Sequence, residues 1–114
     1  MNTVTLSVAS RDAMTARVVA AFDGIPQGPH ISFATVELLW RTLTPKRWDV
    51  LRAMTGQGPL AIREVARSIG RDVKAVHGDV HALLAAGVLE RDGDGRVVFP
   101  YDAVHVDFTL HKAA

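Results

Sequence analysis

The sequence predicts an α+β protein in which helices predominate. Three consecutive segments between residues 45 and 86 place apolar side chains at helical spacing, and each segment ends at or near a glycine. Near each end of the chain, apolar and polar side chains alternate, which is the pattern of a strand with one buried face. The 114 residues are enough for one domain with a modest core.

The composition is that of an ordinary folded domain. Apolar residues make up 48% of the sequence and charged residues 22%. No apolar run reaches the roughly 20 residues of a membrane-spanning helix, and the first residues do not resemble a signal peptide. We therefore expect a cytoplasmic protein without membrane contacts. The absence of cysteine excludes disulfides, thiolate zinc sites and cysteine nucleophiles.

The first 43 residues predict a strand, a helix and a second short strand. Alternating side chains over residues 3–9 predict the first strand. A helix follows from an N-cap at Ser10 to Gly24, a favourable residue just beyond a helix end. Its apolar positions are Met14, Val18, Ala21 and Phe22. A loop rich in proline and glycine over residues 25–30 then leads to a short strand over residues 31–34.

Two N-caps mark the next helices. Thr35 caps a short helix, and Thr44 followed by Pro45 begins a longer one that stops near Gly56. The apolar stripe of the short helix is Val36, Leu39, Trp40 and Leu43. That of the longer helix is Trp48, Val50, Leu51 and Met54.

Two further helices follow, separated by a turn. The first has an apolar face at Ile62, Val65, Ala66 and Ile69 and ends at Gly70. Asp72 caps the second, which stops at Gly87. Its apolar stripe is Val73, Val76, Val80, Leu83 and Leu84. By the same helical arithmetic, His77 lies near this stripe and is expected to be partly buried.

A hairpin and a final strand complete the chain. Residues 88–91 and 96–99 read as two strands joined by the turn sequence DGDG, and Pro100 interrupts the pairing. Beyond it, apolar side chains at every second position from Val104 to Leu110 predict another amphipathic strand.

Three helices followed by a hairpin are the layout of a winged helix-turn-helix (wHTH), predicted here over residues 44–100. Residues 1–43 then form an N-terminal strand-helix extension, used for dimerisation or partner binding, and residues 101–114 a C-terminal amphipathic strand. In this fold the last helix enters the major groove of DNA, and the hairpin lies beside it as a wing.

The expected DNA-contacting surface is the outward face of the last helix together with neighbouring bases. Net charge is only +1, and residues 44–100 carry nine bases against seven acids, so +2. The predicted contacts are Arg63, Arg67, Arg71, Lys74, Ala75, Gly78, His81, Arg91 and Arg96. Solvated arginines and lysines are the alternative for the charged members of this set.

Gly78 lies inside a predicted helix, where glycine costs about 1 kcal/mol relative to alanine. Close approach of the helix to DNA is one reason to tolerate it, and close packing against another helix of the same chain is the other. Asp79, its neighbour, is interpreted as a solvated charge or an intrahelical partner.

No catalytic arrangement emerges, and we expect neither an enzyme nor a cofactor. The chain lacks a nucleophile with a base, paired carboxylates at a useful spacing and a phosphate-binding loop. His77 and His81 are one helical turn apart, a spacing that can bind zinc, but a third ligand would have to come from a distant residue. We expect no metal site, with a metal-sensing regulator as the alternative.

Residues 43–108 closely resemble a family of small prokaryotic wHTH proteins described as MarR-like transcriptional regulators or antitoxins. The most distinctive strings are TPKRW (44–48), GRDVKAVHGDVHAL (70–83) and FPYDAVHVDF (99–108), and FATVELLW (33–40) resembles the family's lead-in. The resemblance implies that the helix over residues 72–86 is the recognition helix. It also implies a neighbouring toxin gene, and hence a cognate toxin as partner.

The combined expectation is a homodimer that places two recognition helices in successive major grooves of double-stranded DNA and blocks transcription at its own promoter. The two terminal strands pair with each other or with those of a second subunit. A monomer in which the N-terminal unit completes a single core is the alternative. A protein-interaction module on a winged-helix scaffold, without DNA binding, is the alternative function.

Overall fold

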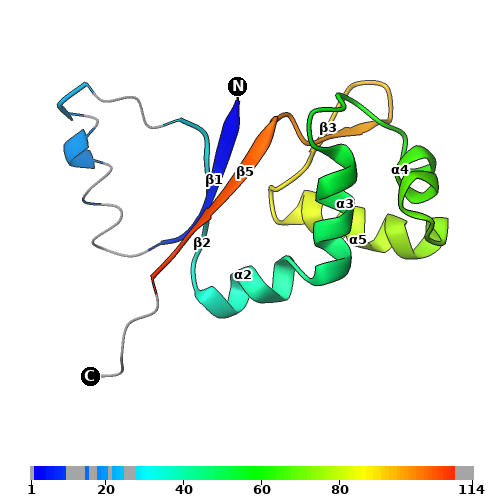
Figure 1. Ribbon diagram of the computed structural model, residues 1–114, viewed down its shortest axis with the longest axis horizontal. Helices are drawn as coiled ribbons and strands as arrows, with labels where there is room; N and C mark the ends of the chain where they lie inside the picture. Colours follow the sequence, from blue (N-terminus) through cyan, green and yellow to red (C-terminus); the bar gives the residue numbers. More distant parts are fainter. Residues whose placement is uncertain (1, 10–14, 16–17, 21, 25–27, 110–114) are drawn as a thin grey trace.

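A strand near the start of the chain and a strand near its end pair in one parallel sheet (Figure 1). In this computed structural model, which describes residues 2–9, 15, 18–20, 22–24 and 28–109, strand β1 (Thr3–Val8) lies at the centre. Strand β2 (His30–Phe33) pairs with one edge of β1 and strand β5 (Ala103–Asp107) with the other, both in parallel. The terminal strands thus pair with each other within one chain, one of the two arrangements expected.

Helix α2 (Val36–Thr42) follows β2 and begins at the predicted cap. The hydroxyl of Thr35 accepts a hydrogen bond from the Leu38 N–H at 3.0 Å. Leu39 is buried, as is Leu43 just after the helix, but Trp40 is 55% exposed. The prediction that Trp40 belongs to the buried stripe is wrong, because α2 covers the core with only one narrow side.

Three helices form the other half of the molecule: α3 (Pro45–Met54), α4 (Ile62–Ile69) and α5 (Val73–Ala85). Each packs against the other two. The cap of α3 is also as predicted, because Thr44 Oγ1 accepts from the Arg47 N–H at 3.3 Å. Only three residues connect α4 to α5, so the two helices meet at a tight corner.

A short hairpin follows α5. Its strands are β3 (Glu90–Arg91) and β4 (Val97–Val98), both shorter than predicted. Leu60, which precedes α4, exchanges two backbone hydrogen bonds with Val97 at 2.8 and 2.9 Å. The hairpin is therefore fixed to the start of α4 and does not extend freely from the domain.

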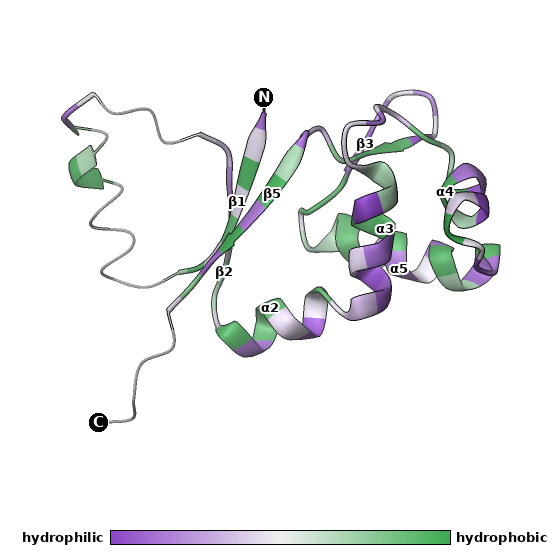
Figure 2. Cartoon of the chain, in the orientation of Figure 1, coloured by the Kyte–Doolittle hydropathy of each residue, from purple (hydrophilic) through white to green (hydrophobic). Residues whose placement is uncertain are grey.

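One hydrophobic core joins the sheet to the helices, and the chain is a compact α+β fold. Buried side chains come from the N-terminal strand, the helices and the hairpin alike. Figure 2 shows that hydrophobic residues occur in all of these elements. The fully enclosed members include Val4, Leu6, Leu39, Leu51 and Val80. Described residues among the first 43, such as Val4, Leu6 and Leu39, therefore belong to the same core as the residues of the three helices.

Several predicted burial states are wrong. Val73, expected in the stripe of α5, is 46% exposed because it occupies the first turn, beyond the reach of α3. His77, expected to be partly buried, is exposed. Of the helix predicted between Ser10 and Gly24, residues 15, 18–20 and 22 are helical and residues 23 and 24 form a turn, and Val18 and Phe22 are 56% and 88% exposed. Residues 10–14, 16–17 and 21 of that segment and Leu110 of the last strand lie outside the described residues.

Within the described part of the chain, no helix is both long enough and apolar enough to cross a membrane.

Candidate nucleic-acid interface

The corner between α4 and α5 is built from backbone constraints that the sequence supplies. Gly70 ends α4 with φ of 66°, a left-handed conformation that favours glycine. The Arg71 N–H then donates to the Ala66 carbonyl at 3.0 Å. Asp72 caps α5 as predicted, with Oδ2 accepting from the Ala75 N–H at 3.2 Å. These contacts set the direction in which α5 leaves the corner.

The outward face of α5 is free of neighbours within the described chain. Lys74, Ala75, Gly78 and His81 are all exposed. A Cβ added to Gly78 would meet no atom within 4 Å. Close packing inside this chain is therefore wrong as an explanation of Gly78, and the face is open to approach from outside.

Asp79, the only acidic residue within α5, is turned away from this face. Its Oδ1 lies 3.2 Å from Nε of Arg47 on α3, and its Oδ2 lies 2.9 Å from Nη2 of Arg71. The Asp79 side chain is only 16% exposed. Asp79 is thus neither a solvated charge nor an intrahelical partner, as the sequence had suggested, but a link between α5 and two other parts of the chain.

Arg47 and Arg71 complete this cluster, which we call the Asp79 ion cluster. Arg47 also donates to the carbonyls of Arg41 and Thr42 at the end of α2, at 3.3 and 3.1 Å. Arg71 donates to the Lys46 carbonyl at 3.4 Å, and its side chain is 20% exposed. The guanidinium predicted to contact DNA is therefore largely engaged within the protein, because a partly buried carboxylate holds it.

The sequence contained a signal for this cluster. Asp79 follows the buried Val76 by three residues and precedes the buried Leu83 by four, so it lies beside the apolar stripe and cannot face fully outward. A carboxylate in that position needs a cation from another element.

Arginines of α4 border a groove at the corner. Arg63 and Arg67 are exposed, as predicted. They line an open groove of about 490 Å³ between the start of α4, the start of α5 and the hairpin turn. The other lining residues are Ala61, Ile62, Glu64, Val73, His77 and Gly95. Because Gly95 and His77 share this groove, the hairpin turn lies next to α5.

The hairpin presents the last two predicted contacts, Arg91 and Arg96, both of them exposed. Asp92 holds the turn between them. Its Oδ1 accepts from the N–H groups of Asp94 and Arg96 at 3.0 and 2.8 Å, and its own N–H donates to the Arg96 carbonyl. The two arginines therefore project from a turn of fixed shape.

His77 and His81 stack on the surface of α5. Their Nε2 atoms are 3.1 Å apart and their ring centroids 4.1 Å. Partial removal from water, the neighbouring His77 and the Arg91 guanidinium together lower the pKa of His81 below its ordinary value of 6.5. His81 therefore stays neutral to a lower pH than an isolated histidine. No group of three or more metal-ligating side chains occurs in the described parts of the chain.

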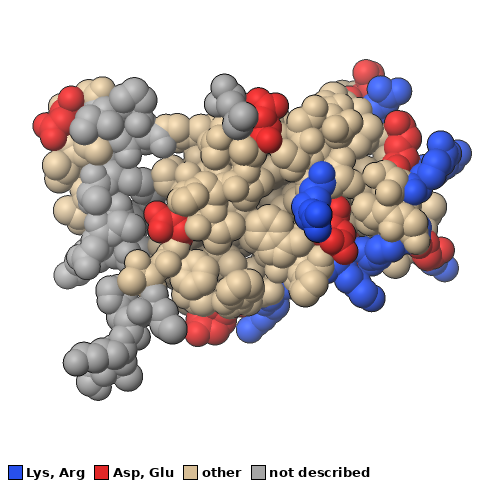
Figure 3. All heavy atoms as spheres, viewed as in Figure 1, with Lys and Arg blue, Asp and Glu red and all other residues tan. Residues whose placement is uncertain are grey.

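Basic side chains are unevenly distributed over the molecule. Among the described residues, Lys and Arg occur only from Arg41 to Arg96, and the strands of the parallel sheet carry none. On the face drawn in Figure 3 they gather over the helices and the hairpin, away from the sheet. Acids are interspersed there, including Glu64, whose carboxylate accepts from the Ala61 N–H at the start of α4.

Comparison with protein families places part of this chain within one of them. The model of the family described as HVO_A0114 matches residues 42–106, more than half of the chain. This range takes in α3, α4, α5, the hairpin and most of β5. No curated protein matches the chain.

Proposed function

The chain belongs to the HVO_A0114 family, and we propose that it is a transcriptional regulator that binds double-stranded DNA through helix α5. In this proposal α3, α4 and α5 form a winged helix-turn-helix, with the β3–β4 hairpin as its wing. The three-residue corner between α4 and α5 and the pairing of Leu60 with Val97 support that assignment.

The outward face of α5 is the observation that carries the proposal. This face has small side chains at Ala75 and Gly78, a base at Lys74 and no acid, because Asp79 is held on the inner side. A bare helix face allows the backbone to come close to base edges, and an acid on it would be repelled by phosphates.

The remaining residues have distinct roles in this proposal. Lys74 and His81 contact DNA within the major groove, while Arg63 and Arg67 on α4 and the wing arginines Arg91 and Arg96 contact phosphates. Phosphate contacts position the protein and carry no sequence information. Arg71 positions α5 through its ion pair with Asp79, so its contribution to DNA contact is indirect.

The proposed regulatory act is autorepression. A homodimer places two α5 helices in successive major grooves of a palindromic site in its own promoter, and occupancy excludes the polymerase. As an antitoxin, the protein would also bind a cognate toxin through residues 1–43. We propose that it is neither an enzyme nor a cofactor-dependent protein.

A salt titration of binding tests the proposal. The purified chain is titrated with the duplex upstream of its own gene and with a scrambled duplex of the same length and composition. We expect tighter binding to the native duplex and a linear fall of log K with log salt concentration. Equal, weak binding to both duplexes would contradict sequence-specific regulation.

A protein-interaction module without DNA binding is the second candidate, and the groove at the corner favours it. Val73 is 46% exposed there and Ile62 lines the same groove, so apolar surface is open to a partner. If this candidate is correct, the product of the adjacent gene copurifies with the wild-type chain and not with Val73→Lys, while neither protein distinguishes the two duplexes.

A further inference from the structure

Strand β5 is an edge of the parallel sheet. The strand order is β2-β1-β5, so β5 has a strand neighbour on one side only among the described residues. The N–H of Thr5 in β1 donates to the carbonyl of Pro29, just before β2, at 3.0 Å, and the N–H of Ala9, just after β1, donates to the carbonyl of Phe33 in β2 at 2.7 Å. Because alternate residues of a strand bond to opposite neighbours, the even-numbered residues of β1 bond to β5.

The same alternation fixes which groups of β5 face the open side. The Ala103 N–H donates to the Asn2 carbonyl at 3.3 Å, so Ala103, His105 and Asp107 bond toward β1. The N–H and C=O groups of Val104 and Val106 therefore point away from the sheet. Nothing in the described part of the chain pairs with them. Such a row of unpaired groups is a template for another strand.

The sequence of this edge is self-complementary about Val106. Residues 104–108 read VHVDF. Antiparallel pairing about a two-fold axis at Val106 sets Val106 opposite its own copy, His105 opposite Asp107 and Val104 opposite Phe108. The even-numbered residues then face one another and exchange their outward N–H and C=O groups in hydrogen-bonded pairs. Moving the two-fold axis by one residue in either direction sets His105 opposite His105 or Asp107 opposite Asp107. His105 and Asp107 then no longer face each other across the two strands.

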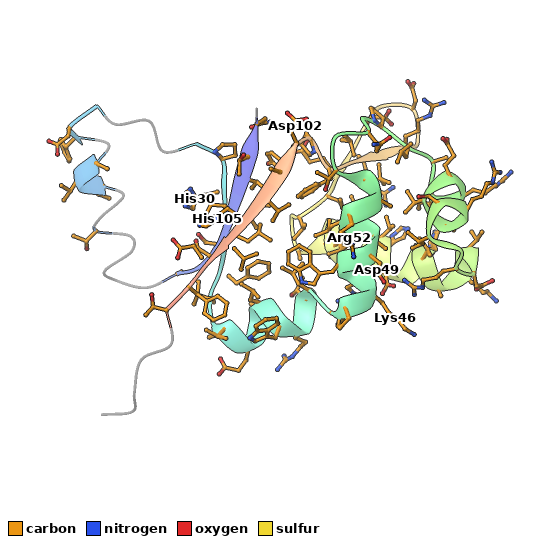
Figure 4. The ribbon with its side chains drawn as sticks, viewed as in Figure 1. His30, Lys46, Asp49, Arg52, Asp102 and His105 are labelled. Atoms are coloured by element: carbon orange, nitrogen blue, oxygen red, sulfur yellow. The ribbon has the colours of Figure 1, made fainter. Side chains whose placement is uncertain are left out.

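Exposed apolar side chains lie along the same edge. Val106 is 37% exposed, and Trp40 of α2 is 55% exposed. The Trp40 ring meets the Phe108 ring edge-on, with centroids 6.0 Å apart. His105, labelled in Figure 4, is exposed on β5. A second strand at this edge would remove part of this apolar surface from water.

From the open edge, its self-complementary sequence and the exposed Val106 and Trp40, we infer that the chain forms a homodimer by antiparallel pairing of β5 with β5 of a second copy. The two three-stranded sheets become one continuous six-stranded sheet. Two-fold pairing occupies the β5 edge of both copies, so pairing through β5 joins two copies and no more. The inference rests on the proposed function, which requires a homodimer but does not specify which surface forms it.

Charge-swap variants with mass measurement test the inference on the full chain without DNA. Light scattering after size-exclusion chromatography is expected to give twice the 12.3 kDa of one chain. His105→Asp places two carboxylates opposite each other at each pair and shifts the mass toward the monomer. His105→Asp with Asp107→Lys restores the dimer, because opposite charges again face one another. Asp49→Lys, on the exposed side of α3, is the control and stays dimeric (Figure 4).

Each outcome has one meaning. A wild-type mass near 12.3 kDa at every concentration overturns the inference. A dimer that persists in both His105→Asp and Val106→Lys, or a double variant that is not restored, shows that another surface or register is used. Far-ultraviolet circular dichroism on every variant confirms that the chain is folded. A β5-dependent dimer that fails to distinguish the two duplexes leaves the inference intact and removes only the DNA-binding proposal.

Discussion

Nη2 of Arg71 lies 2.9 Å from Oδ2 of Asp79, which ties the residue just before α5 to the middle of that helix. Arg47 holds the other carboxylate oxygen from α3. The arrangement fixes the angle between α5 and its support, and it also keeps negative charge off the face proposed to meet DNA. Stability and recognition thus depend on the same carboxylate.

Replacing Asp79 with alanine is expected to lower the free energy of unfolding by about 2 kcal/mol, because the partly buried guanidinium groups of Arg47 and Arg71 lose the carboxylate that pairs with both of them. Chemical denaturation in urea measures this. The matched control is Asp49→Ala on α3, whose exposed side chain lies 4.0 Å from Arg52 and whose loss is expected to cost less than about 0.5 kcal/mol. Equal effects of the two substitutions would show that the Asp79 ion cluster does not stabilise the fold.

Substitutions of Lys74 and of Arg71 are predicted to have different effects on DNA binding and on stability. Lys74→Ala removes an exposed positive charge from the face proposed to meet DNA, so the slope of log K against log salt should fall by about one unit while stability is unchanged. Arg71→Ala should lower the melting temperature and reduce affinity without a comparable change of slope. Binding titrations at several salt concentrations, together with thermal melts, separate the two roles. A reduced slope for Arg71→Ala at unchanged stability would return it to the set of direct contacts.

Gly78→Ala should have opposite effects on folding and on DNA binding. The new Cβ meets nothing within 4 Å, and alanine is favoured over glycine inside a helix by about 1 kcal/mol. We therefore expect the free energy of unfolding to rise by about that amount and affinity for the native duplex to fall.

If Gly78→Ala left the affinity unchanged, close approach of DNA to this position would be excluded.

The protonation of His81 gives a pH prediction. Its pKa is lowered in the folded protein, so the unfolded chain takes up this proton at higher pH than the folded chain does. The free energy of unfolding should therefore decrease as pH falls below 6.5, and His81→Gln should remove this part of the pH dependence. Thermal melts between neutral and mildly acidic pH follow the effect.

An NMR titration of the His81 ring tests the cause directly. The midpoint is expected below 6.5 in metal-free buffer, and His77→Gln should move it upward because one of the named causes is removed. A His81 midpoint that stays at the ordinary value in the wild-type protein would contradict the close ring contact.

Helix starts could be predicted from the sequence because a cap is a local interaction. Thr35, Thr44 and Asp72 each accept a backbone N–H three residues ahead, at 3.0, 3.3 and 3.2 Å. The alternation near the chain ends likewise identified β1 and β5, since it needs only the side-chain period of a strand.

The predictions that were wrong concern features that depend on contacts between residues distant in the sequence. The strand order and the parallel direction depend on pairing between distant segments, since Thr3 of β1 pairs with Ala103 of β5. Trp40, Val73 and His77 have the spacing of buried residues, but neighbouring parts of the chain leave all three exposed. Asp79 has the character of a surface residue, and only the arginines from α3 and from the corner show that it is held inside. The spacing of apolar residues within one helix cannot indicate which of its positions a neighbouring element covers.

Pairing of β1 with β5 also bears on the order in which the molecule acquires its structure. The Asn2 N–H donates to Asp102 across a sequence separation of 100 residues, whereas α3, α4 and α5 pack within a stretch of about forty. Closing the longer loop costs more chain entropy. During synthesis, β1 leaves the ribosome long before its partner strand β5. The helices are therefore expected to gain protection from hydrogen exchange first, and the sheet last.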